Sequence, residues 1–513
     1  MRSKAGDRLY TAVNQLQLDF DFLRAYTSRS VIMKVLMLGW EYPPHIAGGL
    51  GTACEGLTAA LAANGVSIHF VVPEICGGEQ VQHMRFSGAT RGPSPLETSS
   101  ERVSPMPSTT RDRATRDRAT RDQAPLDQAP RDRPEQLVEA GFGASAPIER
   151  SSIPAFLTPY WNQSLFAQAI SFSARERERF AIDETSTSDC ATDLAPQQSK
   201  GPWSIFSEVE RFTLDVLKRF SSCEFDIIHA HDWMTFPAGI ALAQATKRPL
   251  IVHVHSLEHD RSGVFYDKSI NDIERFGLQS ADQIIAVSHY TKSAIERHHS
   301  ISSKKIAVVH NGIYPKQVST EYRQLKTWPT HVVLFLGRVT FQKGPEYFVE
   351  AARKVIPRVD DIVFVLAGDG DLLPTVKDKV ASLKLEDYFI FPGFVQGEEL
   401  EELFSVADLY VMPSVSEPFG IAALEAISFE TPVLVSKRSG VSEVVASALT
   451  VDFWDTDSMA NLIVKVLQQR DLRQELVVSA KQEIAKLHWG RAAEKTCEVY
   501  ERLCSARYGA SQN

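Results

Sequence analysis

Two glutamates eight residues apart, Glu417 and Glu425, stand on either side of a predicted helix start. Pro418 suits the first turn of a helix, and apolar residues follow it at helical spacing. The backbone amides near Gly420 and Ile421 would lack partners inside the helix and could bind an anion. Glu417 would lie beside that anion, and Glu425, about two turns along the same face, could accept hydrogen bonds from hydroxyl groups. This arrangement suits a nucleotide sugar; a surface helix with two solvated glutamates is the alternative.

Two cations follow another predicted strand. Arg338 and Lys343 stand five residues apart in a loop that is bounded by Gly337 and Gly344. Two such cations can neutralise a diphosphate whose negative charge increases while a glycosidic bond breaks. The loop therefore predicts electrostatic stabilisation of a leaving diphosphate without a metal ion. A surface loop with two solvated cations is the alternative.

The two segments resemble the E-x7-E and G-R-x4-K-G elements of the retaining GT-B glycosyltransferases of family 4 (group 1), which include glycogen and starch synthases. The resemblance covers about residues 33–84 and 201–505. It implies an α/β fold of two Rossmann-like domains that face each other across a cleft. It also implies transfer of a sugar from a nucleoside diphosphate sugar to an acceptor hydroxyl, with retained configuration. Arg338 and Lys343 would hold the diphosphate, and Glu417 would support the sugar electrostatically instead of acting as a covalent nucleophile.

A glycine-rich loop follows the first predicted strand. Gly48, Gly49 and Gly51 precede an alanine-rich helix and would let the backbone approach a phosphate or a sugar closely. The loop resembles the family's Gly-Gly-Leu element, although glycogen and starch synthases usually carry lysine where Ala47 stands. This departure removes one donor to the diphosphate and leaves the choice between a UDP- and an ADP-sugar open. The resemblance gives these donor-binding residues: Gly48, Gly49, Asn311, Phe419, Gly420, Ile421 and Glu425.

Polar residues follow two neighbouring predicted strands, Phe225–Ala230 and Leu250–Val254. The carboxyl ends of such strands meet in the crevice where parallel sheets bind ligands. His255 matches the family histidine near the reacting carbon of the donor sugar, which implies a catalytic role beside Glu417, Arg338 and Lys343. His229 and His253 are interpreted as core residues. The same resemblance places three residues on the acceptor side: His231, Asp232 and Trp233.

No metal or other cofactor is predicted. The four histidines within residues 229–255 suggest zinc, but no cysteine or carboxylate follows at a supporting spacing. The six cysteines include no C-x-x-C pair, which fits reduced thiols. Asp369-Gly370-Asp371 spells the Asp-x-Asp signature of metal-dependent glycosyltransferases. Because it directly follows a buried strand, we interpret it as the family's Gly-Asp-Gly turn.

Short apolar runs alternate with helix-like segments, which predicts parallel sheets that are covered on both faces. The expected parts are an N-terminal extension at 1–32, a first Rossmann-like, acceptor-binding domain at 33–315, a second, nucleotide-sugar-binding domain at 330–488, and a C-terminal helix at 489–513 that crosses back to the first domain. Met33 is an alternative translation start. The predicted strands are Met33–Gly39, Ile68–Val72, Phe225–Ala230, Leu250–Val254, Gln283–Val287, Ile306–Val309, Val332–Gly337, Ile362–Gly368, Tyr388–Phe391, Leu409–Pro413 and Pro432–Val435.

The alternation is lost at about residues 85–200. Arg111 to Pro134 repeats an Arg-Asp-x-Ala unit that has no apolar face, which indicates a largely disordered insertion. A basic binding arm is the alternative, but aspartates nearly match the arginines. Aromatic residues at 151–180 could pack on the domain, and the resemblance to glycogen synthases allows the insertion a role in acceptor choice.

The composition is that of a globular protein: 513 residues, a net charge of −9 and 43% hydrophobic residues. Acidic charge without a basic stripe argues against nucleic acid as a partner. No run approaches eighteen apolar residues, and Asp19 and Asp21 stand where a signal peptide needs its apolar centre. We therefore expect a cytoplasmic protein without a transmembrane segment; its oligomeric state stays open.

The segments Trp40–Pro44 and His231–Trp233 look most similar to bacterial glycogen synthases, which implies a glucose donor and an α-1,4-glucan acceptor. A lipid or small-molecule acceptor is the alternative within the family. Outside it, the alternatives are a nucleotide-sugar epimerase and an inactive sugar-binding protein. The intact set Arg338, Lys343, Glu417 and Glu425 argues against the inactive protein.

Overall fold

The structure of the protein, a computed structural model, describes residues 33–42, 49–73, 85–86, 146–153, 155, 204–314 and 331–510. Within these ranges the named strands form two sheets in which all neighbours are parallel. Each sheet and the helices that cover it are called a lobe below; the first lobe contains β1 to β8 and the second β9 to β14. The predicted α/β fold with two Rossmann-like sheets is confirmed.

The first sheet has eight strands in the order β3-β4-β2-β1-β5-β6-β7-β8. β1 lies between β2 and β5, so the chain extends the sheet on one side of β1 and later on the other. Sheets of this kind bind ligands beyond the carboxyl ends of the strands at such a reversal, here β1 and β5. The strands are β1 (Lys34–Leu38), β2 (Ser67–Pro73), β3 (Arg85–Phe86), β4 (Ile148–Ile153), β5 (Ile227–His231), β6 (Leu250–Val254), β7 (Gln283–Ala286) and β8 (Ile306–Val308).

The second sheet has six strands in the order β11-β10-β9-β12-β13-β14. β9 lies between β10 and β12, so the reversal of strand order falls beside β9. The loops after β9 and β12 therefore occupy the position that is equivalent to the loops after β1 and β5. The strands are β9 (His331–Leu336), β10 (Ile362–Ala367), β11 (Phe389–Gly393), β12 (Leu409–Met412), β13 (Val433–Ser436) and β14 (Leu449–Val451).

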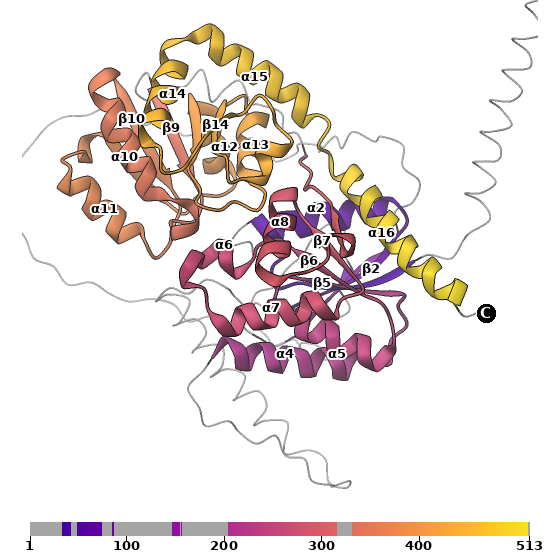
Figure 1. Cartoon of the computed structure of the whole chain (residues 1–513). Helices are drawn as coiled ribbons and strands as arrows, with labels where there is room; N and C mark the ends of the chain where they lie inside the picture. The colour runs from indigo at the N-terminus through magenta and orange to yellow at the C-terminus, as the bar shows by residue number, and fades with distance from the viewer. Residues whose placement is uncertain are drawn as a thin grey trace, which may run out of the picture. The chain divides into compact units, whose positions relative to one another are not determined.

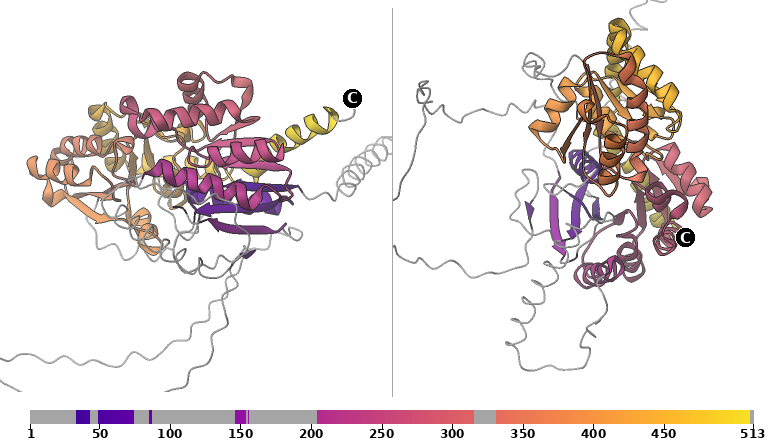
Figure 2. Two further views of the ribbon diagram at one scale, coloured as in Figure 1. Left: turned by 90° about the horizontal axis from the view of Figure 1, so that it is seen from below. Right: turned by 90° about the vertical axis from the view of Figure 1, so that its left-hand side faces the viewer.

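The central strands of the second sheet are apolar on both faces. Along β9, Val333 and Phe335 belong to one hydrophobic core, whereas Val332 and Leu334 belong to another. Successive side chains of a strand point to opposite faces, and helices cover both faces of this sheet, as the right-hand view of Figure 2 shows. This burial on both sides explains why the strands read as continuous apolar runs in the sequence.

Helices connect the strands and cover the sheets (Figure 1). None of those in the described ranges is long and apolar enough to cross a membrane. The first lobe contains α2 (Gly49–Ala63), α4 (Ile205–Phe220), α5 (Phe236–Thr246), α6 (Glu258–Ser262), η1 (Gly263–Phe265), α7 (Lys268–Ser280), α8 (His289–His299) and η2 (Ser303–Lys305). The second lobe contains η3 (Phe341–Lys343), α10 (Pro345–Val355), η4 (Ile356–Arg358), α11 (Leu373–Ser382), η5 (Glu386–Tyr388), α12 (Glu398–Val406), α13 (Ile421–Ser428), η6 (Gly440–Glu443), α14 (Thr456–Gln468) and α15 (Arg470–Ile484).

The last helix, α16 (Trp489–Ala510), packs on the first lobe although the second lobe precedes it in the chain. Trp489 and Tyr500 are buried in the core of the first lobe, and Figure 1 shows the yellow helix beside α2. The hydroxyl of Tyr500 lies 2.7 Å from Nδ1 of His229, which belongs to β5. This buried polar contact fixes the position of the helix along the sheet.

Three strands lie outside the predicted ones: β14, and β3 and β4 within the predicted insertion. β4 pairs with β2 from Ile148 to Ile153, so the interpretation that the strand pattern is lost throughout residues 85–200 is wrong at β4. This strand is short and alternates buried with exposed residues, so it has no apolar run of the kind used to predict the others. The expected disorder in the centre of the insertion, the extension at 1–32 and the irregular stretch at 315–330 lie outside the described residues.

We predict that Tyr500→Phe lowers the free energy of unfolding by about 1–3 kcal/mol, because the buried Nδ1 of His229 then loses its hydrogen-bond partner. Tyr388→Phe is the matched control, because Tyr388 is 38% exposed; its effect should stay within about 0.5 kcal/mol. Urea denaturation followed by tryptophan fluorescence measures both. Equal effects of the two substitutions would contradict a structural role for the contact between Tyr500 and His229.

Candidate active site

A cavity of about 440 Å³ lies between the carboxyl ends of the two sheets. Its volume falls in the range of small-molecule sites in proteins. The first lobe contributes the loops after β1, β5 and β6, and the second lobe those after β9, β10 and β12. These include the two reversals of strand order, so the cavity lies where sheets of this kind bind ligands.

Lys343 and Glu417 form an ion pair in the wall of this cavity. Nζ of Lys343 lies 2.6 Å from Oε2 of Glu417, and Oγ of Ser414 donates to the same oxygen at 3.0 Å. Gly344, which has φ 65°, ends η3 so close to the carbonyl of Pro413 that a β-carbon would lie 2.3 Å from its oxygen. This close approach brings η3 and the loop after β12 together and thereby aligns the pair.

Arg338 supplies a second positive charge, in the loop after β9. Burial lowers the pKa of its guanidinium to about 10, and the nearby carboxylates of Glu41 and Glu417 oppose this decrease. The group therefore stays charged at neutral pH. Because little water surrounds it, its interaction with a bound anion is stronger than that of an exposed arginine.

Two helices point their amino-terminal ends at the cavity. α13 begins at Ile421 after Gly420, whose φ of 105° strains any residue with a side chain, and no side chain caps its amides. α2 begins at Gly49, and a β-carbon there would lie 4.0 Å from Cδ1 of Ile421. Gly49, Gly420, Ile421 and Ala422 all line the cavity. Since the first amides of a helix carry partial positive charge, both helix ends favour an anion at this place.

The fold brings most of the predicted site residues to this one cavity. They come from both lobes and are separated by up to 376 positions in the chain, from Gly49 to Glu425. Gly48 lies outside the described residues. The predicted residues that line the cavity are Gly49, Asp232, Trp233, His255, Asn311, Arg338, Lys343, Glu417, Phe419, Gly420, Ile421 and Glu425.

His231 is a predicted site residue that does not line the cavity. It is fully buried, and its Nδ1 lies 2.9 Å from Nε2 of His255, so it supports His255 from behind instead of reaching an acceptor. Side chains alternate between the two faces of β5, and the side chain of His231 points into the buried core. Asp232 and Trp233 follow the end of the strand and line the cavity. Burial lowers the pKa of His231 to about 3 and that of His255 well below its usual value, so both rings are neutral at pH 7.

Asp232 shapes the loop that carries His255. It has φ 58°, a backbone conformation that aspartate adopts more readily than most residues. Its Oδ1 accepts hydrogen bonds from the amides of His255 at 2.8 Å and Ser256 at 3.4 Å. Burial raises the pKa of this carboxyl to about 7, although these amides and Arg261 oppose the increase.

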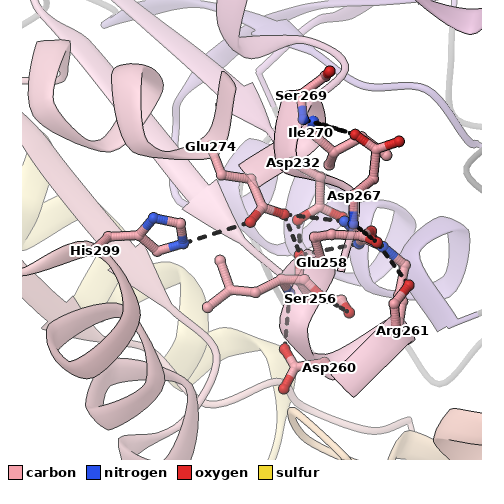
Figure 3. A network of polar contacts seen from close by, with 12 residues as sticks. Asp232, Ser256, Glu258, Asp260, Arg261, Asp267, Ser269, Ile270, Glu274 and His299 are labelled. Atoms are coloured by element: carbon pink, nitrogen blue, oxygen red, sulfur yellow. Dashed lines mark hydrogen bonds and ion pairs between the residues drawn. The ribbon is translucent and has the colours of Figure 1, made fainter. Parts of the chain in front are cut away.

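Arg261 lies behind this loop in a buried network (Figure 3). Its guanidinium lies 3.1 Å from Oε2 of Glu258 and 3.0 Å from Oε1 of Glu274. The backbone carbonyl of Ser256 accepts a further hydrogen bond from it at 3.3 Å. Arg261 thus ties α6, α7 and the loop after β6 into one unit beneath the cavity.

Hydrogen bonds between the lobes hold the segment of Glu417 on both sides. Oγ of Ser416 donates to Oδ1 of Asp260 at 2.5 Å and lies 2.8 Å from the hydroxyl of Tyr290. Oγ of Ser288 donates to the carbonyl of Pro418 at 2.6 Å. Glu417 therefore lies between two residues that are bonded to the opposite lobe.

Glu443 makes a further contact across the lobes, at the start of α8. Its carboxylate accepts hydrogen bonds from the amides of His289 at 2.9 Å and Tyr290 at 2.6 Å, and Nε2 of His310 lies 3.1 Å from it. Although burial alone would raise the pKa of Glu443, these hydrogen bonds lower it. A carboxylate from the second lobe thus caps a helix of the first.

Three charged residues of the cavity were not among the predicted site residues: Glu41, Arg261 and Asp369, the last of which was interpreted only as part of a turn. Glu41 comes shortly after the first buried strand and is itself buried near Arg338. Arg338 was predicted because it follows a buried strand, and the same signal could have identified Glu41. Arg261 gives no comparable signal, because one of its partners, Glu274, comes from α7 and is found only in the fold.

Three family models match the chain. "Glycosyl transferases group 1" matches residues 320–483, "Glycosyltransferase Family 4" residues 196–317, and "Starch synthase catalytic domain" residues 34–109. The first covers most of the second lobe, and the other two cover parts of the first lobe.

Several relatives are similar in sequence. An uncharacterized glycosyltransferase of Methanocaldococcus jannaschii is 27% identical over 91% of this chain and 98% of its own length. An alpha-maltose-1-phosphate synthase of Mycolicibacterium smegmatis is 28% identical over 54% of this chain and 79% of its own length. A glycogen synthase of Mycobacterium tuberculosis is 27% identical over 54% of this chain and 68% of its own length.

Solved structures share the fold. A sucrose-phosphate synthase of Thermosynechococcus elongatus matches with a TM-score of 0.60 at 18% identity, over 92% of this chain and 100% of the other. HepE of Anabaena, solved in complex with UDP and glucose, matches with a TM-score of 0.54 at 16% identity over the same shares. At such identities the likeness concerns the fold alone.

We predict that the stability of the protein depends on pH through Asp232. Its pKa of about 7 in the folded protein exceeds the ordinary value of 3.8, so its contribution to stability is fully present below about pH 4 and is lost as the pH rises through 7. In Asp232→Asn this dependence is absent, so the free energy of unfolding of the wild type relative to the variant should fall by about 4 kcal/mol between pH 4 and pH 8.

Urea denaturation at several pH values measures this difference. Asp371→Asn is the control, because Asp371 is an exposed carboxyl in the turn after β10, and its curve should run parallel to that of the wild type. If Asp232→Asn also gave a parallel curve, Asp232 would not keep its proton in the folded protein.

Proposed function

The chain belongs to the group 1 glycosyltransferases of family 4, with the GT-B fold, and from this premise we propose that it transfers glucose from a nucleoside diphosphate glucose to an α-1,4-glucan with retention of configuration. The observation that carries the proposal is the pair Lys343 and Glu417 beside Arg338, at the place where two helix amino-terminal ends converge. Such a site matches an anion that is joined to a polar, uncharged group.

The donor would bind with its diphosphate among the positive groups. Arg338, Lys343 and the first amides of α13 surround the place where negative charge increases as the bond to the sugar breaks. Glu425, on the face of α13 that lines the cavity, would accept hydrogen bonds from ribose. UDP and ADP both fit this description, so the nucleotide is left to the experiment below.

Binding of the diphosphate would change the partner of Lys343. Glu417 now neutralises this lysine at 2.6 Å, and a phosphate oxygen would compete for the same Nζ. Glu417 would then face the sugar, where its carboxylate stabilises the positive charge that develops at the anomeric carbon. In a retaining transfer the acceptor hydroxyl attacks on the face of the leaving diphosphate, whose oxygen takes the hydroxyl proton.

His255 would position the sugar as a neutral group. Its lowered pKa leaves the ring uncharged, so it offers a hydrogen bond without repelling the developing positive charge. Two hydrogen bonds fix the orientation of His255. One joins its ring to the ring of His231, and the other runs from its backbone amide to Oδ1 of Asp232. Trp233 and Asp232 line the first-lobe wall, where the acceptor would enter.

A glucan acceptor is supported by the match to the starch synthase catalytic domain and by the glycogen synthase of Mycobacterium tuberculosis. The second candidate is a small acceptor such as a sugar phosphate. The alpha-maltose-1-phosphate synthase among the relatives favours it, because its product joins glucose to a glucose phosphate.

Release of nucleoside diphosphate from UDP-glucose and ADP-glucose tests the proposal, with glycogen, glucose 1-phosphate or no acceptor. We predict release that depends on glycogen. Lys343→Ala and Glu417→Ala should each lower kcat by about 10²- to 10³-fold, because each removes charge that stabilises the transition state. Lys437→Ala is the control, because Lys437 pairs with Asp452 away from the cavity, and it should keep nearly full activity.

If release of nucleoside diphosphate requires glucose 1-phosphate instead of glycogen, the acceptor is the small molecule and not the glucan. Release without any acceptor, accompanied by an epimerised sugar, would indicate an epimerase. Binding of the donor without release would indicate the inactive sugar-binding protein.

A further inference from the structure

Three sulfur and nitrogen ligands meet at the inner wall of the cavity: Cys54 from α2, His231 at the end of β5, and His255 after β6. Sγ of Cys54 lies 3.8 Å from Nδ1 of His231, and this nitrogen lies 2.9 Å from Nε2 of His255. All three atoms lie within 4.8 Å of one another. The residues are far apart in the sequence, so no spacing motif announces them.

The distances are close to those of a tetrahedral zinc site. Bonds of about 2.3 Å to sulfur and 2.0–2.1 Å to nitrogen at tetrahedral angles place sulfur about 3.6 Å from nitrogen and two nitrogens about 3.4 Å apart. The observed 3.8 Å and 2.9 Å differ from these values by about half an ångström or less, and the third pair, Cys54 and His255, lies within 4.8 Å. One thiol and two imidazoles are also a ligand set that zinc prefers.

The charges around this cluster favour a cation. Burial lowers the pKa of both histidines, so each ring is neutral at pH 7 and has one unprotonated nitrogen that can bind an ion. Burial and the carboxylates of Glu41 and Asp232 raise the pKa of the Cys54 thiol. The same two carboxylates would stabilise a divalent ion that replaces the thiol proton.

The cavity gives an ion access to the cluster. His255 lines the cavity and is partly exposed, while Cys54 and His231 lie behind it and are fully buried. A second group, His229, His231 and His253, has no such access, because all three rings are buried and His229 is bonded to Tyr500 and His253. The cluster next to the cavity is therefore the one that can take an ion from solution.

We propose that Cys54, His231 and His255 bind a divalent transition-metal ion such as Zn²⁺, with a water of the cavity as the fourth ligand, and that the bound ion withdraws His255 from the substrate. Binding breaks the hydrogen bond between the two histidines and the S–H bond of Cys54. The proton of the histidine hydrogen bond moves to the other nitrogen of its own ring, so that both facing nitrogens can bind the ion while both rings stay neutral. The thiol proton passes to solvent, so about one proton leaves per ion bound, and no electron is transferred. Occupation would inhibit the enzyme, because His255 cannot bind the ion and orient a sugar at once.

Cobalt binding tests the site without any assumption about activity. The full chain, freed of metal by a chelator, is titrated with Co²⁺. Coordination by a thiolate gives a sulfur-to-cobalt charge-transfer absorption in the near ultraviolet, and tetrahedral coordination gives intense visible bands. We expect one Co²⁺ per chain with both features, displaced by one equivalent of Zn²⁺.

Cys54→Ser and Cys54→Ala should abolish the charge-transfer absorption and weaken binding by more than about 100-fold. Serine keeps the size of the side chain in case alanine destabilises the packing of α2. Cys223→Ala is the matched control, because Cys223 is exposed and distant from the histidines in the described structure; it should bind like the wild type. The proposed site would be refuted if the wild type gave no charge-transfer absorption with Co²⁺, or if both Cys54 variants kept this absorption.

The inhibitory consequence rests on the proposed transferase function and has its own readout. Micromolar Zn²⁺ should lower the transfer rate at least tenfold in the wild type and in Cys223→Ala. The transfer rate of Cys54→Ser should be nearly the same with and without Zn²⁺. Cobalt binding without any transferase activity would refute the proposed function and leave the metal site standing; an equal effect of Zn²⁺ on the rates of Cys54→Ser and the wild type would refute the inhibition.

Discussion

The buried positive charge of Arg338 is the constraint on which the architecture of the site depends. A guanidinium in so little water is costly, and its pKa of about 10 reflects that cost. The carboxylates of Glu41 and Glu417 reduce the cost, but they belong to different lobes, so the charge is stabilised only while both lobes border it. A ligand diphosphate would supply further negative charge at the same place. In the protein alone, the carboxylate of Glu417 supplies part of this negative charge through its ion pair with Lys343.

Glu417 links the charged site to the contact between the lobes. Glu417 stands between Ser416 and Pro418, which bond to Asp260 and Ser288 of the first lobe. Its own backbone bonds to Arg438 and Gly440, beside the turn that carries Glu443. Any movement that separates the lobes must break these hydrogen bonds and move Glu417 at once. Closure of the lobes and placement of the Glu417 carboxylate are thus a single event in this fold.

How far the sequence predicts this arrangement depends on how local the signal is. Strands β9 and β12 are apolar on both faces and could be predicted, and the charged residues predicted after them, Arg338, Lys343 and Glu417, line one cavity. The confirmed family resemblance rests on these strand-end motifs. β4 was missed, because four consecutive polar residues, Glu149 to Ser152, separate its two isoleucines and leave no apolar run, and its pairing with β2 crosses 74 intervening residues, from 74 to 147. Arg261 and the contacts of Ser416 with Asp260 and Tyr290 were missed, because their partners are set by the tertiary fold.

The histidines show where local reasoning fails and what the fold adds. His229, His231, His253 and His255 end two adjacent strands, and their rings stack at centroid distances of 4.2–5.3 Å. Several positive charges this close would repel strongly in a buried place, so the stack is stable only while the rings are neutral. Neutral rings need hydrogen-bond partners. The histidines bond to one another in pairs, and Tyr500 of α16 and Cys54 of α2 are further partners. In the first lobe, the neutral and polarizable ring of His255 therefore lines the cavity beside the charged side chains of Glu41 and Arg261. The proposed transfer would bring the sugar against this ring, while Arg338 and Lys343 of the second lobe would hold the leaving anion.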